Sequence, residues 1–106
     1  MVGRIWEISV PPAAAAEFEA FAGEWALPMV RGQMGCSAVH VLRDGDSPGR
    51  YVWISLWLSR KALAVAAASP AWEEARRRFA RFGVAFELDA ARALESIASF
   101  RAGEAG

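Results

Sequence analysis

The sequence contains no asparagine and no threonine, and it has only one histidine, one cysteine and one tyrosine. The single cysteine, Cys36, excludes an internal disulfide and fits a reducing, cytoplasmic environment. The single histidine, His40, is the only side chain that ordinarily titrates near neutral pH. A metal site built from clustered cysteines and histidines is therefore not expected.

The chain also lacks a net charge, because 12 basic residues balance 12 acidic ones. A protein that binds nucleic acid or an anionic membrane generally needs a basic excess. No apolar run approaches the roughly 20 residues of a membrane-spanning helix, and the first residues lack the layout of a signal peptide. We therefore expect one domain over residues 1–101 with a flexible tail at 102–106, and neither nucleic-acid nor membrane partners.

What the sequence does contain is a stretch, residues 51–58, that is apolar on both faces when it is read as a strand. One face carries Val52, Ile54, Leu56 and Leu58, and the other carries Tyr51, Trp53, Ser55 and Trp57. Such a strand must be covered on both sides. We expect the tryptophan face to line a pocket beneath the chain's own helices, and the aliphatic face to meet a second copy of the chain.

The other elements follow from periodicity and from turn residues. The predicted strands are 3–10, 36–43 and 93–100, and the predicted helices are 13–27, 60–68 and 69–82. The alanine and glutamate content of residues 93–100 also suits a helix. Pro28 is expected to stop the first helix, because the residue before a proline avoids the helical region. Alternation places Cys36 and His40 on one face of their strand, and residues 84–91 show no clear pattern.

The order strand, helix, strand, strand, helix, strand is typical of an α+β, ferredoxin-like βαββαβ fold. This fold has a four-stranded antiparallel sheet with both helices on one face. The second face of the sheet then has no cover within the chain. A homodimer with face-to-face sheets, forming a dimeric α+β barrel, is the expected assembly.

Several short motifs carry a family resemblance when they are taken in order. They are residues 6–12 (Trp-Glu-Ile-Ser-Val-Pro-Pro), Phe18-Glu19, Gly35, Tyr51 with residues 55–59, and residues 69–72 (Ser-Pro-Ala-Trp) ten residues after Ser59. From about residue 4 to residue 100 the chain resembles the antibiotic biosynthesis monooxygenase (ABM) domain of the dimeric α+β barrel superfamily. The resemblance implies a cofactor-independent monooxygenase that acts on or binds a hydrophobic aromatic, quinol- or polyketide-like molecule. The alternative is a non-catalytic binding or interaction module of the same fold.

The heme-degrading relatives within this superfamily use a first-strand asparagine and a heme-ligating histidine on the second helix. Trp6 or Glu7 stands at the first of these positions, and the second falls near Arg76. A guanidinium has no lone pair to offer iron. Heme degradation is therefore not expected, and the resemblance implies no cofactor.

Two residues are candidates for catalysis. His40 could act as the base that deprotonates a phenolic substrate, or it could be a strand histidine that faces the dimer partner. Arg76 could stabilise the substrate anion, or it could simply pair with an acid or with water. The candidate ligand-binding residues are Trp53, Trp57, Trp72, Tyr51 and Phe79, for which core packing is the alternative.

Overall fold

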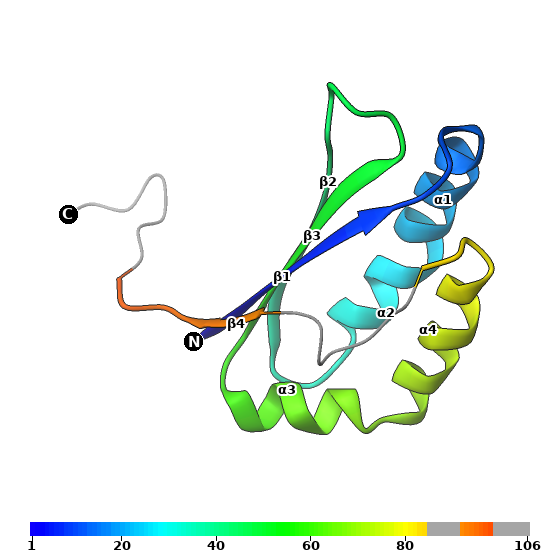
Figure 1. Cartoon of the computed structure of the whole chain (residues 1–106). Coiled ribbons are helices and arrows are strands. Elements are labelled where there is room, and N and C mark those ends of the chain that lie inside the picture. The colour runs from blue at the N-terminus through cyan, green and yellow to red at the C-terminus, as the bar shows by residue number, and fades with distance from the viewer. Residues whose placement is uncertain (85–91, 99–106) are drawn as a thin grey trace.

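The computed structural model describes residues 1–84 and 92–98 of the chain (Figure 1). The strands are β1 (Val2–Ser9), β2 (Cys36–Arg43), β3 (Arg50–Trp57) and β4 (Arg92–Glu95). The helical segments are η1 (Pro12–Ala14), α1 (Ala15–Phe21), η2 (Ala22–Ala26), α2 (Leu27–Arg31), α3 (Arg60–Ala67) and α4 (Pro70–Ala80).

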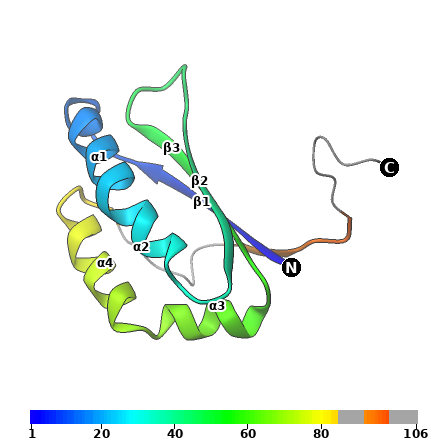
Figure 2. The same ribbon diagram turned by 180° about the vertical axis from the view of Figure 1, so that it is seen from behind.

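The four strands form one antiparallel sheet in the order β2-β3-β1-β4. Figures 1 and 2 show that the helices all lie on one side of this sheet, with α1 and α2 beside α4. The predicted α+β, ferredoxin-like fold with a four-stranded antiparallel sheet is therefore confirmed. None of the helices within residues 1–84 and 92–98 combines the length and hydropathy needed to cross a bilayer.

The two faces of the sheet differ sharply in burial. On β3, Tyr51, Trp53, Ser55 and Trp57 are buried beneath the helices, whereas Val52, Ile54 and Leu56 are only half-buried. We call the second face the outer face; it includes Val52, Ile54 and Leu56 of β3, Ile5 of β1, and Ala38, His40 and Leu42 of β2. Helices therefore cover the tryptophan face, as expected, and no described residue covers the aliphatic one.

Aromatic side chains fill the space between sheet and helices. The largest side chains with almost no exposure are Trp57, Trp72, Phe18 and Phe79. Phe18 of α1 and Phe79 of α4 lie 6.1 Å apart between ring centres, and Trp57 lies 6.1 Å from Trp72. Edge-to-face contacts of this kind add to the stabilisation from burial.

The prediction that Pro28 stops the first helix is wrong. The helix continues to Arg31, and Pro28 occupies the second position of α2. The π-helical turn η2 comes just before it, and there the Leu27 amide bonds to the Ala22 carbonyl, five residues back. A π turn widens the helix, so the proline ring avoids the carbonyl with which it would otherwise clash.

Two strand predictions also need correction. The last strand ends at Glu95 and not at residue 100. Ser96–Ala98 are not part of a strand, although the Ser96 amide still donates a hydrogen bond to the Met1 carbonyl, and residues 99–100 lie outside the described part. In β2, a bulge between Cys36 and Ala38 shifts the register, so Cys36 pairs with Trp57 and packs against the core. His40 pairs with Ile54 on the outer face. The extra residue of a bulge reverses the alternation that the sequence pattern assumed.

Candidate functional site

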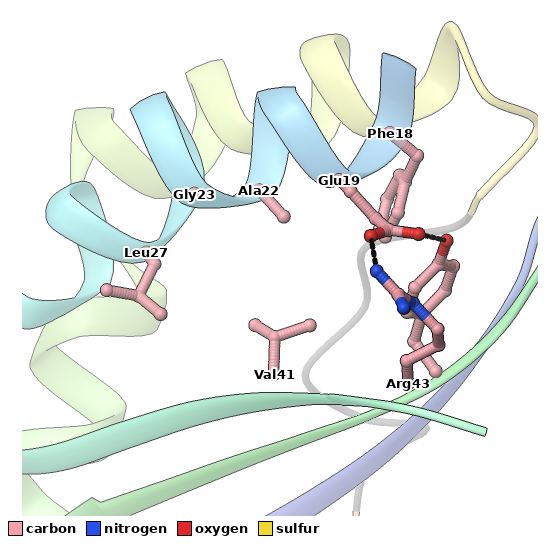
Figure 3. A pocket seen from close by; sticks show the side chains of 8 residues that line it. Phe18, Glu19, Ala22, Gly23, Leu27, Val41 and Arg43 are labelled. Carbon is pink, nitrogen blue, oxygen red and sulfur yellow. Dashed lines mark hydrogen bonds and ion pairs between the residues drawn. The ribbon is translucent and has the colours of Figure 1, made fainter. Parts of the chain in front are cut away.

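A cavity of about 250 Å³ lies between the α1–η2–α2 segment and the strands β2 and β3. Its lining residues are Phe18, Glu19, Ala22, Gly23, Leu27, Val41, Arg43 and Tyr51. In Figure 3, Ala22 and Leu27 extend from the helical side toward Val41 on the strand side. Most of this wall is therefore aliphatic or aromatic, which is typical of a site for an apolar small molecule.

The polar residues of the cavity are gathered at one end. The Tyr51 hydroxyl donates a hydrogen bond of 2.8 Å to Oε2 of Glu19, and Arg43 forms an ion pair with Oε1 of the same carboxylate (Figure 3). Glu19 comes from α1, whereas Arg43 and Tyr51 are directly opposite each other on β2 and β3. Three elements thus converge on one charged cluster, which we call the Glu19 cluster (Glu19, Arg43 and Tyr51).

The protonation of the Glu19 cluster follows from these contacts. Burial, and then the hydrogen bond to the Glu19 carboxylate, raise the pKa of Tyr51 to about 12. Hydrogen bonds from Arg43 and Tyr51 lower the pKa of Glu19, and the carboxylate raises the pKa of Arg43. At neutral pH the cavity therefore presents a neutral phenol and a closed ion pair, with guanidinium donors left over for a ligand.

Among the predicted ligand-binding residues, Tyr51 lines this cavity. The other four, Trp53, Trp57, Trp72 and Phe79, are at most 4% exposed and belong to the hydrophobic core. Phe79 contacts Phe18, a wall residue, with ring centres 6.1 Å apart. Phe79 therefore supports the cavity wall from the core, and contact of these four residues with a ligand stays a prediction.

The two predicted catalytic residues lie apart from the cavity. His40 is exposed on the outer face of the sheet, opposite the side on which the cavity lies. Arg76 is partly exposed on α4 and pairs with Glu73 one helical turn away. The structure does not bring the two side chains together, and their roles as base and anion stabiliser stay predictions.

Glu19 and Arg43 were not predicted as site residues. Glu19 belongs to the Phe18-Glu19 motif of the family resemblance, but a helix-forming acid does not by itself mark a site. Arg43 left a usable signal, because residues 36–43 and 51–58 form a hairpin whose near ends pair Arg43 with Tyr51. The position of the helix above that pair is a tertiary feature that the hairpin does not encode.

Metal and thiol chemistry find little support within residues 1–84 and 92–98. No group of three or more histidine, cysteine, aspartate or glutamate side chains there could hold a metal ion. Burial raises the pKa of the Cys36 thiol, which leaves less of the reactive thiolate at neutral pH. We therefore treat Cys36 as a packing residue.

The fold and the cavity define a class, namely small α+β domains that enclose an apolar pocket between helices and an antiparallel sheet. Residues 1–78 match the family model of antibiotic biosynthesis monooxygenases, which is more than half of the chain. The chain belongs to this family, as the sequence motifs indicated. No curated protein sequence matches the chain.

Solved structures agree on the fold. The chain is similar to a proposed antibiotic biosynthesis monooxygenase from Deinococcus radiodurans, with a TM-score of 0.80, 21% identity, and coverage of 95% of this chain and 97% of that one. HapK from Hahella chejuensis gives a TM-score of 0.81, 19% identity, and coverage of 98% and 100%. A proposed antibiotic biosynthesis monooxygenase from Caulobacter crescentus gives a TM-score of 0.74 and 22% identity, with coverage of 92% of this chain and 90% of that one. At these identities the likeness establishes the fold and not a shared substrate.

Proposed function

We propose that the protein is a cofactor-independent monooxygenase that takes a hydrophobic aromatic, quinol- or polyketide-like molecule into the cavity between α1–α2 and the sheet. The observation that carries this proposal is the cavity itself, with apolar walls and one charged cluster at its end. Its volume is close to the lower end of small-molecule sites, roughly 300–1,000 Å³. A flat ring system would fit with one edge at the opening.

The chemistry proposed for such a substrate needs a proton to leave and an anion to be sheltered. A quinol-type substrate loses a ring hydroxyl or methylene proton, and the resulting anion reacts with dioxygen. The methylene becomes a carbonyl, one oxygen atom enters the product and the other leaves as water, so the substrate supplies all four electrons. Apolar walls favour this reaction by excluding water from the anion.

The assignment of the cation that faces the anion rests on position. Arg43 lies in the cavity wall and keeps donors beyond its ion pair with Glu19, whereas Arg76 pairs with Glu73 on α4. We therefore favour Arg43 for contact with the substrate anion. His40, the base predicted from the sequence, lies on the outer face, so it could act only on a substrate that reaches that face.

Oxygen uptake with an anthrone-type quinol tests the cavity. A Cβ added at Gly23 would meet no atom within 4 Å, so Gly23→Leu should place its side chain in the cavity without a clash. We expect this variant to lose at least tenfold in kcat/KM while its fold is retained. Ala20→Leu, at an exposed α1 position outside the lining, is the matched control. Equal rates in the Gly23→Leu variant and the wild type would contradict the proposed site.

Substitutions of the proposed catalytic residues separate their roles. Arg43→Met should raise KM and lower kcat if Arg43 holds the substrate anion. His40→Ala should lower kcat if His40 is the base. Unchanged rates in both His40→Ala and Arg76→Ala would remove the two sequence-based assignments and leave the cavity proposal standing.

The second candidate is a non-catalytic module that binds the same class of ligand. Two observations favour it: the sequence has no asparagine, and the carboxylate in the cavity is held ionised, which makes it a weak base. Tight binding of a flat aromatic ligand without oxygen uptake would decide for this module. We also propose a homodimer through the outer face, because three aliphatic residues of β3 have no cover among the described residues.

A further inference from the structure

Apart from the aromatic residues, two polar side chains are buried in the described part of the chain, and they lie opposite each other. Arg4 is 6% exposed and Ser55 is 2% exposed. Arg4 of β1 pairs with Ser55 of β3 in the register of the sheet, and both point to the face that the helices cover. Directly opposite side chains have Cβ atoms roughly 5 Å apart. The pair therefore forms one polar spot in an apolar core.

The Arg4 guanidinium has no counter-charge among the described residues. Its Nε atom is buried without a hydrogen bond, and burial lowers the pKa of Arg4 to about 10, so the group is still charged at neutral pH. Other arginines pair with glutamates; they are Arg43, Arg60, Arg76, Arg77 and Arg78. A buried charge without a partner is strongly unfavourable, so an anion that reached Arg4 would be bound well.

Ser55 adds a second unused donor beside Arg4. Its Oγ accepts a hydrogen bond of 2.9 Å from Nε1 of Trp57, and its own hydroxyl proton has no acceptor among the described residues. The Trp57 ring in turn packs edge-on against Trp72, with 6.1 Å between ring centres. The spot thus combines a guanidinium, a hydroxyl donor and two indole rings.

We propose that Arg4 and Ser55 form an anion-binding site, distinct from the cavity, for the carboxylate or phenolate group of an apolar organic molecule. The Arg4 guanidinium donates hydrogen bonds to the carboxylate or phenolate oxygens, and the Ser55 hydroxyl donates one more. The indole rings contact the apolar remainder of the ligand. Tyr51 of the cavity and Ser55 are four residues apart on one strand, which corresponds to about 13 Å. The proposal therefore does not depend on the oxygenase assignment.

Benzoate is a suitable probe because it joins a carboxylate to a flat apolar ring. We expect benzoate to raise the thermal unfolding midpoint of the full chain and to bind in a calorimetric titration. Benzamide, which has the same shape without the charge, should bind at least tenfold more weakly. Inorganic phosphate tests whether any anion suffices; phosphate binding without benzoate binding would overturn the proposal for an organic ligand.

Substitutions locate the site. Arg4→Met should weaken benzoate binding at least tenfold and leave the ligand-free protein as stable as the wild type or more stable, because it removes an unpaired charge. Ser55→Ala should weaken binding by a smaller factor. Arg60→Met, in an exposed ion pair with Glu95, is the control and should bind benzoate as the wild type does.

Three outcomes would overturn the proposal. Wild-type affinity in Arg4→Met would show that benzoate does not use Arg4. Loss of binding in Arg43→Met but not in Arg4→Met would place the anion in the cavity. An unfolded or strongly destabilised Arg4→Met would show that Arg4 has an internal partner.

Discussion

At the scale of single residues, position in the fold decides what a charged or aromatic side chain can do. Glu19 and Glu73 look alike in the sequence, since both are acids within helices. Glu19 accepts hydrogen bonds from both a tyrosine and an arginine at a cavity, whereas Glu73 pairs with Arg76 on the helix surface. The same carboxylate group therefore lines a cavity in one place and makes only a local ion pair in the other.

The Tyr51 hydroxyl gives a direct test of the Glu19 cluster, because Tyr51 is the only tyrosine in the chain. An alkaline titration followed by phenolate absorbance should give a midpoint near 12 instead of the ordinary 10. Since the folded pKa is the higher one, the native state holds this proton more tightly. The resulting stabilisation is complete below a pH of about 10 and is lost as the pH rises toward 12.

Glu19→Gln should lower this midpoint by removing the carboxylate, but not to 10, because burial is the largest cause of the shift. Glu17→Gln, at an exposed position on the same helix, should leave the midpoint where it is. A wild-type midpoint near 10 in the folded protein would contradict the described geometry of the cluster.

At the scale of elements, local irregularities correct what periodicity alone predicts. The bulge at Cys36 reverses the side on which that residue points, and the π turn η2 lets the helix pass through Pro28. Neither feature has a period, so neither appears in an alternation or a helical pattern. Both irregularities are determined by packing against the adjacent strands and helices.

Gly49, at the end of the turn between β2 and β3, shows how tightly such fitting constrains the chain. Its φ is +86°, and an added Cβ would lie 2.2 Å from the Val10 carbonyl oxygen. Gly49→Ala should therefore lower the free energy of unfolding by more than about 1 kcal/mol. Urea denaturation at a fixed protein concentration measures this effect.

Gly45 of the same loop is the matched control for Gly49. An added Cβ there meets nothing within 4 Å, so Gly45→Ala should change the unfolding free energy by less than about 0.5 kcal/mol. Equal effects of the two substitutions would show that the close approach of Gly49 to Val10 does not constrain the loop.

At the scale of the whole molecule, the open question is what lies against the outer face. Val52, Ile54 and Leu56 are half-buried there, Ile5 is 41% exposed, and Leu42 is 51% exposed. An apolar sheet face of this size is typical of an interface and is unfavourable in water. A second copy of the chain would cover it by face-to-face packing of the two sheets.

Sedimentation equilibrium should therefore find the wild type as a dimer, with a thermal midpoint that rises with protein concentration. Ile54→Asp should give a monomer and a lower midpoint, because it buries an unpaired carboxylate in the proposed interface. Val65→Asp, at a position on α3 that is 62% exposed, should remain a dimer. A monomeric wild type would contradict the proposed assembly.

The sequence by itself determined the class of fold and much of the core. Alternation in residues 51–58 separated the tryptophan face from the aliphatic face, and Ser59 and Ser69 marked the starts of α3 and α4, where their side chains accept hydrogen bonds from Ala62 and Trp72. These features follow from short-range geometry, since side-chain period and capping involve residues near one another in the chain.

Only the tertiary structure decided which polar groups meet. Glu19 contacts Arg43, which is 24 residues away in the sequence, and Tyr51, which is 32 residues away. Arg4 lies opposite Ser55 on a neighbouring strand that is far away in the sequence. A cavity or a buried charge depends on how helices settle on a sheet, and that packing depends on all the side chains between them. Short-range periodicity does not encode this packing. The sequence pattern therefore predicted the aromatic residues of the core but not the charged residues that lie beside them.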